Sequence, residues 1–504
     1  MTPRARRVGV SLLGIGTMAG VFGVIARAQT VPFPASKWSR VLIVSGGPTA
    51  NYNQYAIESN ARYVASLTKN ATWRRVLFAD GKPASKTIST VADNSRIRAR
   101  AIASWVFDYD APNDVIEYKA PTLTPITGTA APDSITRNLA AFGATKNPTA
   151  PELVYFTGHG GPGSGFGGRK DYVNTVYSGW GDDLSERQLA RSLQTSTSTA
   201  PLVLIMVQCH SGGFANTLFQ DGDPTKPIWN RDFCGFFASV ADRQASGCTS
   251  QVNERDYQDF TTHFFAALSG VSRDGRRITG ADYNRDGKVS LDEAYAYTQI
   301  TDDSIDVPLS TSDAYLRFIW PREANNNWQK TSFARLLKDA TPSQKAVLTA
   351  LSQKLRLVGE NRLVAAQKRL TAEAKAASKP QADEWTTPKG IDEAQFNASY
   401  DRIETLLIAR FPNAENLRGA AKTRVLNDAT TLLLQRPADL NIVYRAYALS
   451  TASEEDGEVE EARLLRFLRE GRSIILTQRL QKDGTPDQKA VFARLCTSEN
   501  RSAF

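Results

Sequence analysis

The chain has 504 residues, of which 41% are hydrophobic and 22% charged, and its formal net charge is +9. These values are typical of an ordinary globular protein with room for two or three domains. The basic residues are interspersed with acidic ones and form no clustered basic run, so the charge balance predicts no nucleic-acid partner.

Residues 1–28 have the pattern of a cleaved secretory signal peptide. Arg4, Arg6 and Arg7 precede an apolar run from Val8 to Ile25, and Ala26-Arg27-Ala28 offers the small residues that signal peptidases accept. A retained transmembrane anchor is the alternative, which the glycines within the run disfavour. No later stretch is apolar enough to span a bilayer. We therefore expect a periplasmic or secreted protein without a stable membrane span after cleavage, by an export route that stays open.

After the signal, short apolar runs alternate with amphipathic stretches, which predicts an α/β fold with a mostly parallel sheet flanked by helices. The expected strands are Arg40–Ser45, Arg75–Phe78, Leu153–Thr157, Leu202–Val207 and Gly235–Val240. Ser185-Glu186-Arg187-Gln188 is a capping box, so a helix between the third and fourth strands completes one crossover unit. Ligands of such sheets bind at the carboxyl ends of the strands, which directs attention to the residues after Thr157 and Val207.

From about Arg322 onward the strand pattern gives way to charged amphipathic helices. We therefore expect an α/β domain at residues 29–321 and a separate all-α region at residues 322–504, with a flexible linker near residues 371–390. Residues 338–347 and 482–491 differ at only two positions, and both are typical of a helix start with a Thr N-cap and a Pro in the first turn. Shared capping chemistry and a duplicated helical unit would both explain the likeness.

Two residues with reactive side chains follow neighbouring apolar runs. His159 lies in Thr157-Gly158-His159-Gly160-Gly161, and Cys209 lies in Gln208-Cys209-His210-Ser211-Gly212. Adjacent parallel strands would place both side chains at one sheet edge, where a thiol and an imidazole can cooperate. Their separation of about 50 residues is also found in caspases. The alternatives are an inert buried cysteine beside a loop histidine, and a metal site of His159, Cys209 and His210, which lacks a further ligand cluster.

The residues around this pair resemble those of legumains. Tyr155-Phe156-Thr157-Gly158-His159-Gly160 is similar to the Tyr-Phe-Thr-Asp-His-Gly of that family, and Gln208-Cys209-His210-Ser211-Gly212 resembles its Ala-Cys-Glu-Ser-Gly. The strand that leads into Tyr52-Asn53-Gln54-Tyr55 is similar to the legumain strand before Tyr-Asn-Tyr-Arg-His. Caspases share the His-Gly and Cys-x-Gly pattern more loosely. The likeness covers about Val41 to Trp320.

The resemblance implies a caspase-like fold and a cysteine endopeptidase that acts on a peptide or protein substrate. With the signal peptide, we expect an exported member of this group, with a bacterial source preferred. It implies that His159 and Cys209 are the catalytic pair, accompanied by Asn53, with an oxyanion held by the backbone N–H groups of Gly160 and Cys209. Cys209 would form a thioester acyl-enzyme and His159 would protonate the departing amine. Legumains carry a helical C-terminal region that caps the site, so intramolecular capping by residues 322–504 is expected by analogy, with partner binding as the alternative.

Several positions depart from the legumain pattern. Tyr55 and Ala56 replace the arginine and histidine of that family, and this arginine helps to form the pocket for the residue before the cut. The resemblance therefore leaves the substrate open. Gly158 replaces the aspartate before the catalytic histidine and Gln208 the alanine before the cysteine, and neither change removes a reacting group.

Residues 282–293 fit the twelve-residue EF-hand calcium loop throughout. The predicted ligands are Asp282, Asn284 and Asp286 through side-chain oxygens, Lys288 through its carbonyl, and Glu293 through a bidentate carboxylate. Gly287 allows the bend that the loop requires. We therefore expect one Ca²⁺ ion, structural or activating, and no organic cofactor. An acidic surface turn before a helix at residues 292–299 is the alternative.

We expect structural roles for the remaining cysteines and histidines. In an exported chain, Cys234 and Cys248 lie close enough in sequence to form a disulfide, which would leave Cys209 and Cys496 unpaired. His263 lies among helical apolar residues and is expected to pack there. His210 is expected to point away from Cys209 on an extended chain.

The sequence leaves a second function open, which belongs to a different class from the enzyme. A calcium-binding or scaffolding protein could use the same fold with a vestigial Cys–His pair. The presence of both reacting residues, with glycines on either side of them, favours the enzyme.

Overall fold

The computed structural model describes residues 31–91, 94–109, 116–143, 150–165, 168–321, 326–377 and 387–504. The predicted signal peptide at residues 1–28 lies outside these ranges. No helix within them is both long enough and apolar enough to cross a membrane.

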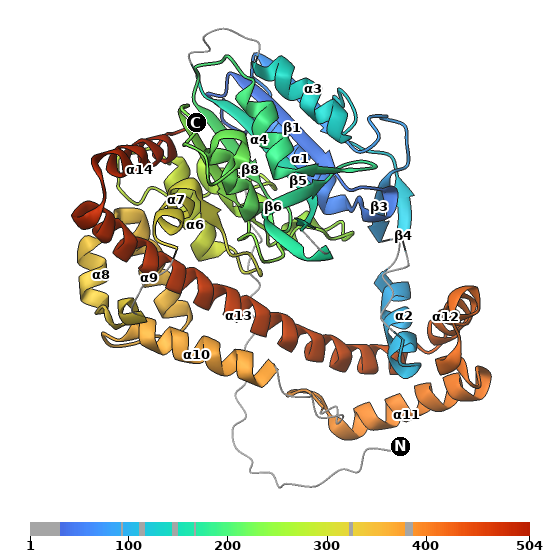
Figure 1. Ribbon diagram of the computed structural model, residues 1–504. Coiled ribbons are helices and arrows are strands. Elements are labelled where there is room, and N and C mark those ends of the chain that lie inside the picture. Colours follow the sequence, from blue (N-terminus) through green and yellow to red (C-terminus); the bar gives the residue numbers. More distant parts are fainter. Residues whose placement is uncertain are drawn as a thin grey trace.

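The centre of the molecule is a sheet whose strands follow the order β2-β1-β5-β8-β9-β10 (Figure 1). Their bounds are β1 Arg40–Gly46, β2 Trp73–Phe78, β5 Glu152–Ser164, β8 Leu202–Met206, β9 Phe233–Phe237 and β10 Leu309–Ser310. All neighbours in this order pair in parallel except β10, which is antiparallel to β9. The predicted mostly parallel sheet is therefore confirmed, with β9 lying two residues earlier than expected.

Strand β5 does not end at Thr157, as predicted from the sequence, but continues to Ser164. Its second half leaves the main sheet and pairs with β6, Lys170–Ser178, which pairs in turn with β7, Asp183–Ser185. Glycine-rich sequence does not favour a strand by propensity, and it is the antiparallel partner that keeps this segment extended. His159 therefore lies within a strand.

Helices cover both faces of the sheet. Helix α1, Tyr55–Leu67, packs with α5, Phe260–Ser269, and α6, Leu291–Thr301, on one face. On the other face lie α3, Pro132–Gly143, and α4, Glu186–Gln194. The predicted capping box is present, because the Ser185 side chain accepts from the Gln188 N–H at the start of α4. The short elements beside these layers are η1 Ala50–Tyr52, η3 Ser211–Leu218, η4 Gln220–Gly222, η5 Glu254–Asp256 and α7 Thr311–Ile319.

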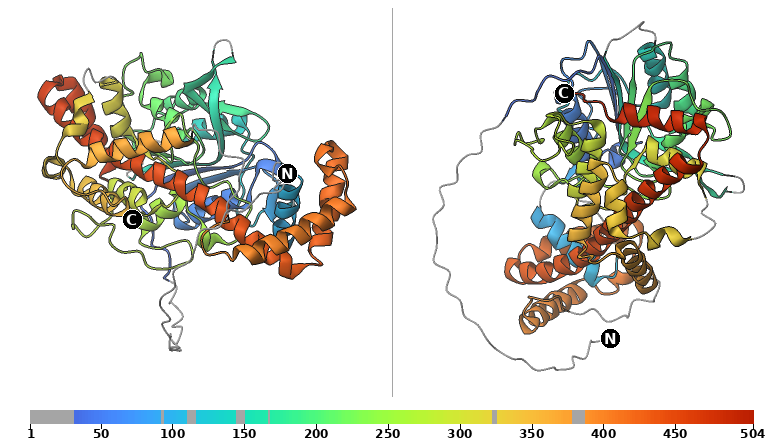
Figure 2. Two further views of the ribbon diagram at one scale, coloured as in Figure 1. Left: turned by 90° about the horizontal axis from the view of Figure 1, so that it is seen from below. Right: turned by 90° about the vertical axis from the view of Figure 1, so that its left-hand side faces the viewer.

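The chain after residue 325 is helical, as predicted. Its elements are η6 Asn326–Lys330, α8 Phe333–Asp339, α9 Pro342–Lys354, α10 Arg362–Ala377, α11 Glu393–Arg410, η7 Ala414–Asn416, α12 Gly419–Leu433, α13 Pro437–Asp483 and α14 Pro486–Glu499. Helix α13 is 47 residues long and crosses below the sheet (Figures 1 and 2). Helices α9 and α14 both begin with the capping box expected from the repeated motif. Of the predicted linker, residues 371–377 complete α10, and residues 378–386 lie outside the described ranges.

The boundary near residue 321 does not divide the chain into two separate bodies. Leu495 of α14 belongs to the core on one face of the sheet, and Ala503 of the C-terminal tail belongs to the core on the other face. Conversely, α2, Asn94–Val106, leaves the α/β domain between the small strands β3, Ile88–Val91, and β4, Ile116–Lys119. It packs with α11, α12 and α13 in a separate apolar cluster. The C-terminal region is helical, as expected, and apolar packing joins it to the α/β domain in both directions.

A buried carboxylate ties the amino ends of the central strands together. Glu152 at the start of β5 is fully buried and accepts hydrogen bonds from Arg40 Nη1 at 3.4 Å and Arg231 Nη2 at 2.6 Å. Ser198 Oγ also donates to it, at 3.1 Å. This ion network lies at the edge of the sheet opposite to His159 and Cys209.

Candidate active site

His159 lies in β5, and Cys209 lies in the turn three residues after the end of the neighbouring strand β8. Strands β5 and β8 pair in parallel with a constant offset of 50 residues, from Glu152 opposite Leu202 to Phe156 opposite Met206. The Val207 N–H donates to the Phe156 carbonyl at 3.0 Å, so the two chains stay together beyond the last paired residue. Beyond this point β5 pairs with β6 and the chain after Val207 turns, so the parallel pairing does not extend to His159 and Cys209.

The two side chains also project from the same face of the sheet. Successive side chains of a strand alternate between faces. Leu153 and Tyr155 of β5 and Val203 and Ile205 of β8 all belong to the apolar cluster under α1 and α5. His159 Nε2 contacts Gln54 at the start of α1, and Cys209 Sγ contacts Ala245 of this same cluster, so both side chains lie on the α1 side. Both residues therefore lie just beyond the paired parts of β5 and β8, where Gly160 comes close to the Cys209 carbonyl.

Gly160 is required for the close approach of the two strand ends. A Cβ atom at this position would lie 2.4 Å from the carbonyl oxygen of Cys209 and 2.5 Å from Cγ of Gln208. Gly158 has φ +155°, and a Cβ there would lie 2.4 Å from the carbonyl oxygen of Gly46. Tyr177 Oη donates to this same carbonyl at 3.1 Å. The tyrosine thus occupies the space in which an aspartate at position 158 would have to fit.

The imidazole of His159 is held by Gln54, the N-cap residue of α1. His159 Nε2 lies 2.8 Å from Gln54 Oε1. An amide oxygen only accepts, so this hydrogen bond is made by the tautomer that carries its proton on Nε2. Tyr52, whose ring is 56% exposed, meets the imidazole edge to face at 5.8 Å between ring centroids.

Asn53 does not accompany the pair, which corrects the assignment made by resemblance. Its side chain is fully buried; Oδ1 accepts from the Gly47 N–H at 3.3 Å and Nδ2 donates to the Thr87 carbonyl at 3.2 Å. These bonds hold the turn after β1. The residue missed by the sequence reasoning is Gln54. The one signal for it was its position between a strand end and a helix start at the same sheet edge.

The thiol of Cys209 faces a short segment after β9. The Ala245 N–H donates to Cys209 Sγ at 3.3 Å, and Sγ donates to the Ala245 carbonyl at 3.6 Å. Burial raises the pKa of the Cys209 thiol, which the Ala245 N–H partly opposes. Burial also lowers the pKa of His159, against the effect of the Tyr52 backbone. Both groups are therefore neutral at pH 7, and no hydrogen bond joins them in the described part of the chain.

The other two histidines have structural partners. His210 adopts φ +60°, so the chain turns directly after Cys209 and is not extended there, contrary to expectation. Its Nδ1 lies 2.8 Å from the Ala241 carbonyl oxygen. His263 in α5 is half-buried, and its ring is hydrogen bonded to Gln258 and Thr301.

Gln208, directly before the thiol, is only 1% exposed, and neither polar atom of its amide has a hydrogen-bond partner among the described residues. Burying an amide without partners costs about 1–3 kcal/mol. The side chain lies on the face opposite to Cys209 and packs against Gly160. The Gln208 side chain therefore supports the packing of the chain ends that follow β5 and β8.

All four cysteines, Cys209, Cys234, Cys248 and Cys496, are free thiols, and the expected bridge between Cys234 and Cys248 is absent. Cys234 pairs with Val203 near the start of β8, at the level of Leu153. Cys248 Sγ lies 3.5 Å from the carbonyl oxygen of Gly158, five residues further along β5. At about 3.3 Å per residue the two thiols lie about 16 Å apart along the strands, beyond the reach of a disulfide.

The predicted calcium loop folds as a closed turn held by its own backbone. Asp286 N–H donates to Asn284 Oδ1 at 2.8 Å, and Gly287 N–H donates to Asp282 Oδ2 at 3.0 Å. Gly287 has φ +84°, as the bend requires. Glu293 accepts from Ser290 N–H at 3.0 Å and so caps α6. Within the described ranges no three His, Cys, Asp or Glu side chains are close enough to hold a metal ion together.

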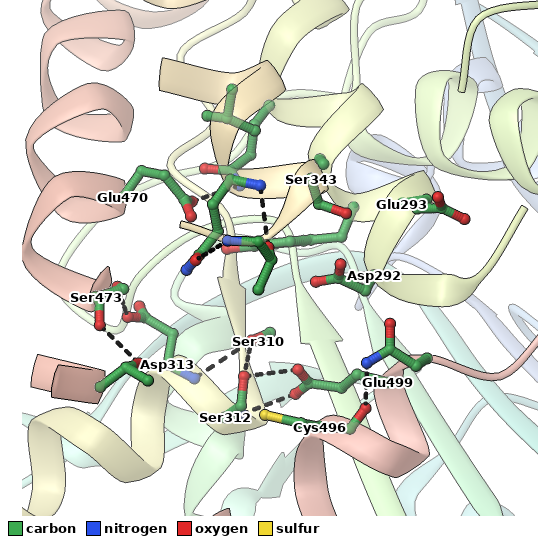
Figure 3. A pocket seen from close by; sticks show the side chains of 18 of the residues that line it. Asp292, Glu293, Ser310, Ser312, Asp313, Ser343, Glu470, Ser473, Cys496 and Glu499 are labelled. Carbon is green, nitrogen blue, oxygen red and sulfur yellow. Dashed lines mark hydrogen bonds between the residues drawn. The ribbon is translucent and has the colours of Figure 1, made fainter. Parts of the chain in front are cut away.

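A cavity of about 310 Å³ lies between α6, α7, α9, α13 and α14. Figure 3 shows the carboxylates of Asp292, Glu470 and Glu499 around it. Burial raises the pKa of Glu470 and of Glu499 to about 7. His159 and Cys209 do not line this cavity.

Comparisons with known proteins add little. No protein-family model and no curated protein matches the chain. Among solved structures, the chain is similar to one described as protein GSU0716 from Geobacter sulfurreducens. The TM-score is 0.30 at 8% identity, covering 54% of this chain and 92% of the other. A similarity this low says nothing about function.

Proposed function

We propose that the chain is a cysteine endopeptidase of the caspase and legumain type, on a caspase-like sheet. The proposal is supported by the position of His159 and Cys209 close to each other, just beyond the paired parts of β5 and β8 and on the α1 side of the sheet. A thiol and an imidazole need this proximity to act as nucleophile and base. The glycine at position 160 supports the same role, because it lets the two strand ends approach.

The reaction proceeds in two steps. Cys209 Sγ attacks the peptide carbonyl as its proton passes to His159, and the C–N bond breaks when His159 delivers that proton to the departing amine. Water then attacks the thioester, gives a proton to the imidazole, and releases the acid and the free thiol. The backbone N–H groups of Gly160 and Cys209 are the proposed oxyanion donors, each contributing about 3 kcal/mol to the transition state.

The neutral state of His159 and Cys209 determines when the proton moves from the thiol to the imidazole. Burial disfavours both the thiolate and the imidazolium, so a preformed ion pair would be unstable at this site. His159 therefore takes the thiol proton only as the carbonyl is attacked. Gln54 keeps the ring oriented with the proton on Nε2.

The substrate is a peptide or protein whose preferred residue beside the cut is open. Tyr55, at the position of the legumain specificity arginine, is engaged by Arg62 Nη2 at 3.4 Å and by Glu254 Oε1 at 3.2 Å. A tyrosine in such a network cannot bind an asparaginyl side chain as the arginine would. Export to the periplasm or the medium belongs to the same proposal, and cell fractionation tests it.

Covalent labelling tests the proposed activity. An electrophilic peptide probe should label the wild-type chain at Cys209 and leave Cys209→Ala unlabelled. His159→Ala should be labelled more slowly. Absence of labelling in the wild type, with and without calcium, would contradict the peptidase and favour a scaffolding protein with a vestigial pair.

We also propose that residues 282–293 bind one Ca²⁺ ion. The oxygen ligands lie at the required sequence positions, and Asp282, Asn284 and Asp286 already point into the loop, where they accept its N–H groups. Binding would require Glu293 to exchange its backbone partners for the ion. Calorimetric titration should show one site in the wild type and none in Asp286→Ala. An unchanged heat in the variant would contradict the site.

Capping of the site by the C-terminal helices stays a prediction. Within the described ranges, no residue after Arg322 is hydrogen bonded to the side chain of His159, Cys209 or Gln54. Side chains of α13 are instead hydrogen bonded to the segment that faces Cys209 and to the turn that carries Asp306.

A further inference from the structure

The segment Ala241–Cys248, hereafter the 241–248 segment, holds the residues at the end of β8 in place. Ala245 contacts Cys209 Sγ through both its N–H and its carbonyl. The Arg243 carbonyl accepts from the His210 N–H at 2.9 Å, and the Ala241 carbonyl contacts the His210 ring. The surroundings of the thiol therefore depend on where this segment lies.

Asp306 holds the 241–248 segment in place through a hydrogen bond to its backbone. Its carboxylate is fully buried, and Oδ1 accepts from the Ser246 N–H at 2.6 Å. Oδ2 accepts from the Phe260 N–H at 3.2 Å at the start of α5. Because Ser246 directly follows Ala245, a displacement of Asp306 would move the N–H that faces the thiol.

Arg466 of α13 fixes the turn that carries Asp306. Its side chain is only 1% exposed, and its guanidinium donates to four backbone carbonyls and lies 4.0 Å from the Asp302 carboxylate. Nε donates to Asp306 at 2.6 Å, Nη2 to Ser304 at 2.9 Å, and Nη1 to Gln299 at 3.3 Å and also to Asp302. A rigid, planar set of donors suits such a cluster, which a lysine could not reproduce. The turn is thus bound to the middle of α13.

A second contact joins α13 to the same segment directly. Arg243 Nη1 donates to Glu461 Oε1 at 2.8 Å. Glu461 and Arg466 are five residues apart on one helix, so α13 touches the 241–248 segment at Arg243 and supports it through Asp306.

We propose that α13 supports the Cys209 thiol from a distance, and we call this support the strut. Arg466 and Glu461 are its positioning residues: they keep Ala245 against Cys209 and so set the reactivity of the thiol. The importance of this strut for catalysis rests on the proposed function. Its effect on the Cys209 thiol does not, because that thiol can be measured without any peptide substrate. The C-terminal helices would then support the active enzyme, and their removal would lower its reactivity.

The test is the rate of alkylation of Cys209 by iodoacetamide in the full chain, followed by mass spectrometry of the Cys209 peptide from pH 6 to 10. Arg466→Met should slow the reaction about tenfold at pH 7.5, since losing an N–H donor raises the thiol pKa by about one unit. Glu461→Gln, which weakens a partly exposed pair, should slow it about twofold. Arg469→Met is the matched control. Arg469 lies on the same helix but pairs with Asp313, away from the 241–248 segment.

The strut is contradicted if folded Arg466→Met has the wild-type rate and pH profile, or if Arg469→Met changes them equally. Should Arg466→Met fail to fold, Glu461→Gln decides, and a wild-type rate in that variant overturns the proposal. If the chain is not a peptidase, the expected result is different. Cys209 would then respond to these substitutions in a chain that cleaves no peptide.

Discussion

The imidazole of His159 is hydrogen bonded to Gln54 at 2.8 Å, while the neighbouring Asn53 faces the opposite way and holds the turn after β1. A shift of one residue in the orienting side chain thus separates this chain from the legumain pattern. An amide keeps the ring in one tautomer without adding a charge that would raise its pKa.

Gln54→Ala should lower kcat/KM about tenfold, because one hydrogen bond of about 1.4 kcal/mol that orients the base is lost. Gln54→Glu should move the acid limb of the pH–rate profile to higher pH, since a carboxylate beside the ring raises the pKa of His159. Steady-state kinetics from pH 5 to 9 measures both effects.

The control for Gln54 is Asn53→Ala. It leaves the Gly47 N–H and the Thr87 carbonyl without their partner and should cost about 1–3 kcal/mol of stability. Its acid limb should stay in place. A shift of that limb in Asn53→Ala, and none in Gln54→Glu, would restore Asn53 as the orienting residue.

In the absence of substrate, the thiol of Cys209 should behave as a neutral group independent of His159. Its alkylation rate should keep rising with pH beyond the ordinary thiol range, because burial raises its pKa. His159→Ala should change this rate by less than about twofold, whereas a thiolate–imidazolium pair would lose most of its reactivity near neutral pH. A plateau below pH 7 that vanishes in His159→Ala would show that such a pair exists.

The ion network at the amino ends of the strands should matter for stability and not for catalysis. Glu152→Ala leaves Arg40 and Arg231 buried without their carboxylate. It should cost about 3–5 kcal/mol, the usual effect of breaking a buried pair. Denaturant unfolding measures the loss. Turnover per folded, titrated thiol should match the wild type, and a proportional fall in turnover would link this edge to the site.

The carboxylates around the cavity of Figure 3 should make stability fall as the pH rises. The pKa values of Glu470 and Glu499 are about 7 in the folded chain, against 4.5 ordinarily. The folded state therefore binds more protons than the unfolded state between these values. Stability should be highest below pH 4.5, as far as these groups are concerned, and should fall until about pH 7, by at most about 3 kcal/mol per group.

Substitution separates this effect from other titrations. Glu470→Gln and Glu499→Gln should each flatten the fall and be more stable than the wild type at pH 8. Asp313 is the contrasting control. Burial acts to raise its pKa, but Arg317 and Arg469 outweigh it and hold the pKa at about 2. Asp313→Asn should destabilise the chain at pH 8, and a stabilising effect there would contradict this assignment.

Much of the sheet could be predicted from the sequence because its information is local. The apolar runs gave the five parallel strands, and the 50-residue offset between β5 and β8 equals the spacing of His159 and Cys209. The helix starts at Ser185, Thr341 and Thr485 followed from capping residues within one turn. Local patterns of this kind do not depend on the rest of the fold.

The features that the sequence did not reveal depend on contacts between distant segments. Residues 159–164 of β5 are extended because β6 pairs with them. Ala503 completes a core that begins at Trp38, and Arg466 binds carbonyls more than 150 residues earlier in the chain. Gln54 and Asn53 are both amides beside a strand end. Only the turn after η1 decides which of them reaches His159.

The central claim is that Cys209, assisted by His159, hydrolyses peptide bonds. The most direct measurement is cleavage of a diverse peptide library by the full chain, with and without calcium, compared with Cys209→Ser. The account predicts internal cuts with a consistent preference beside the cut in the wild type and none in the variant. Cleavage that persists in Cys209→Ser, or a wild-type chain that cuts no peptide under either condition, would contradict it.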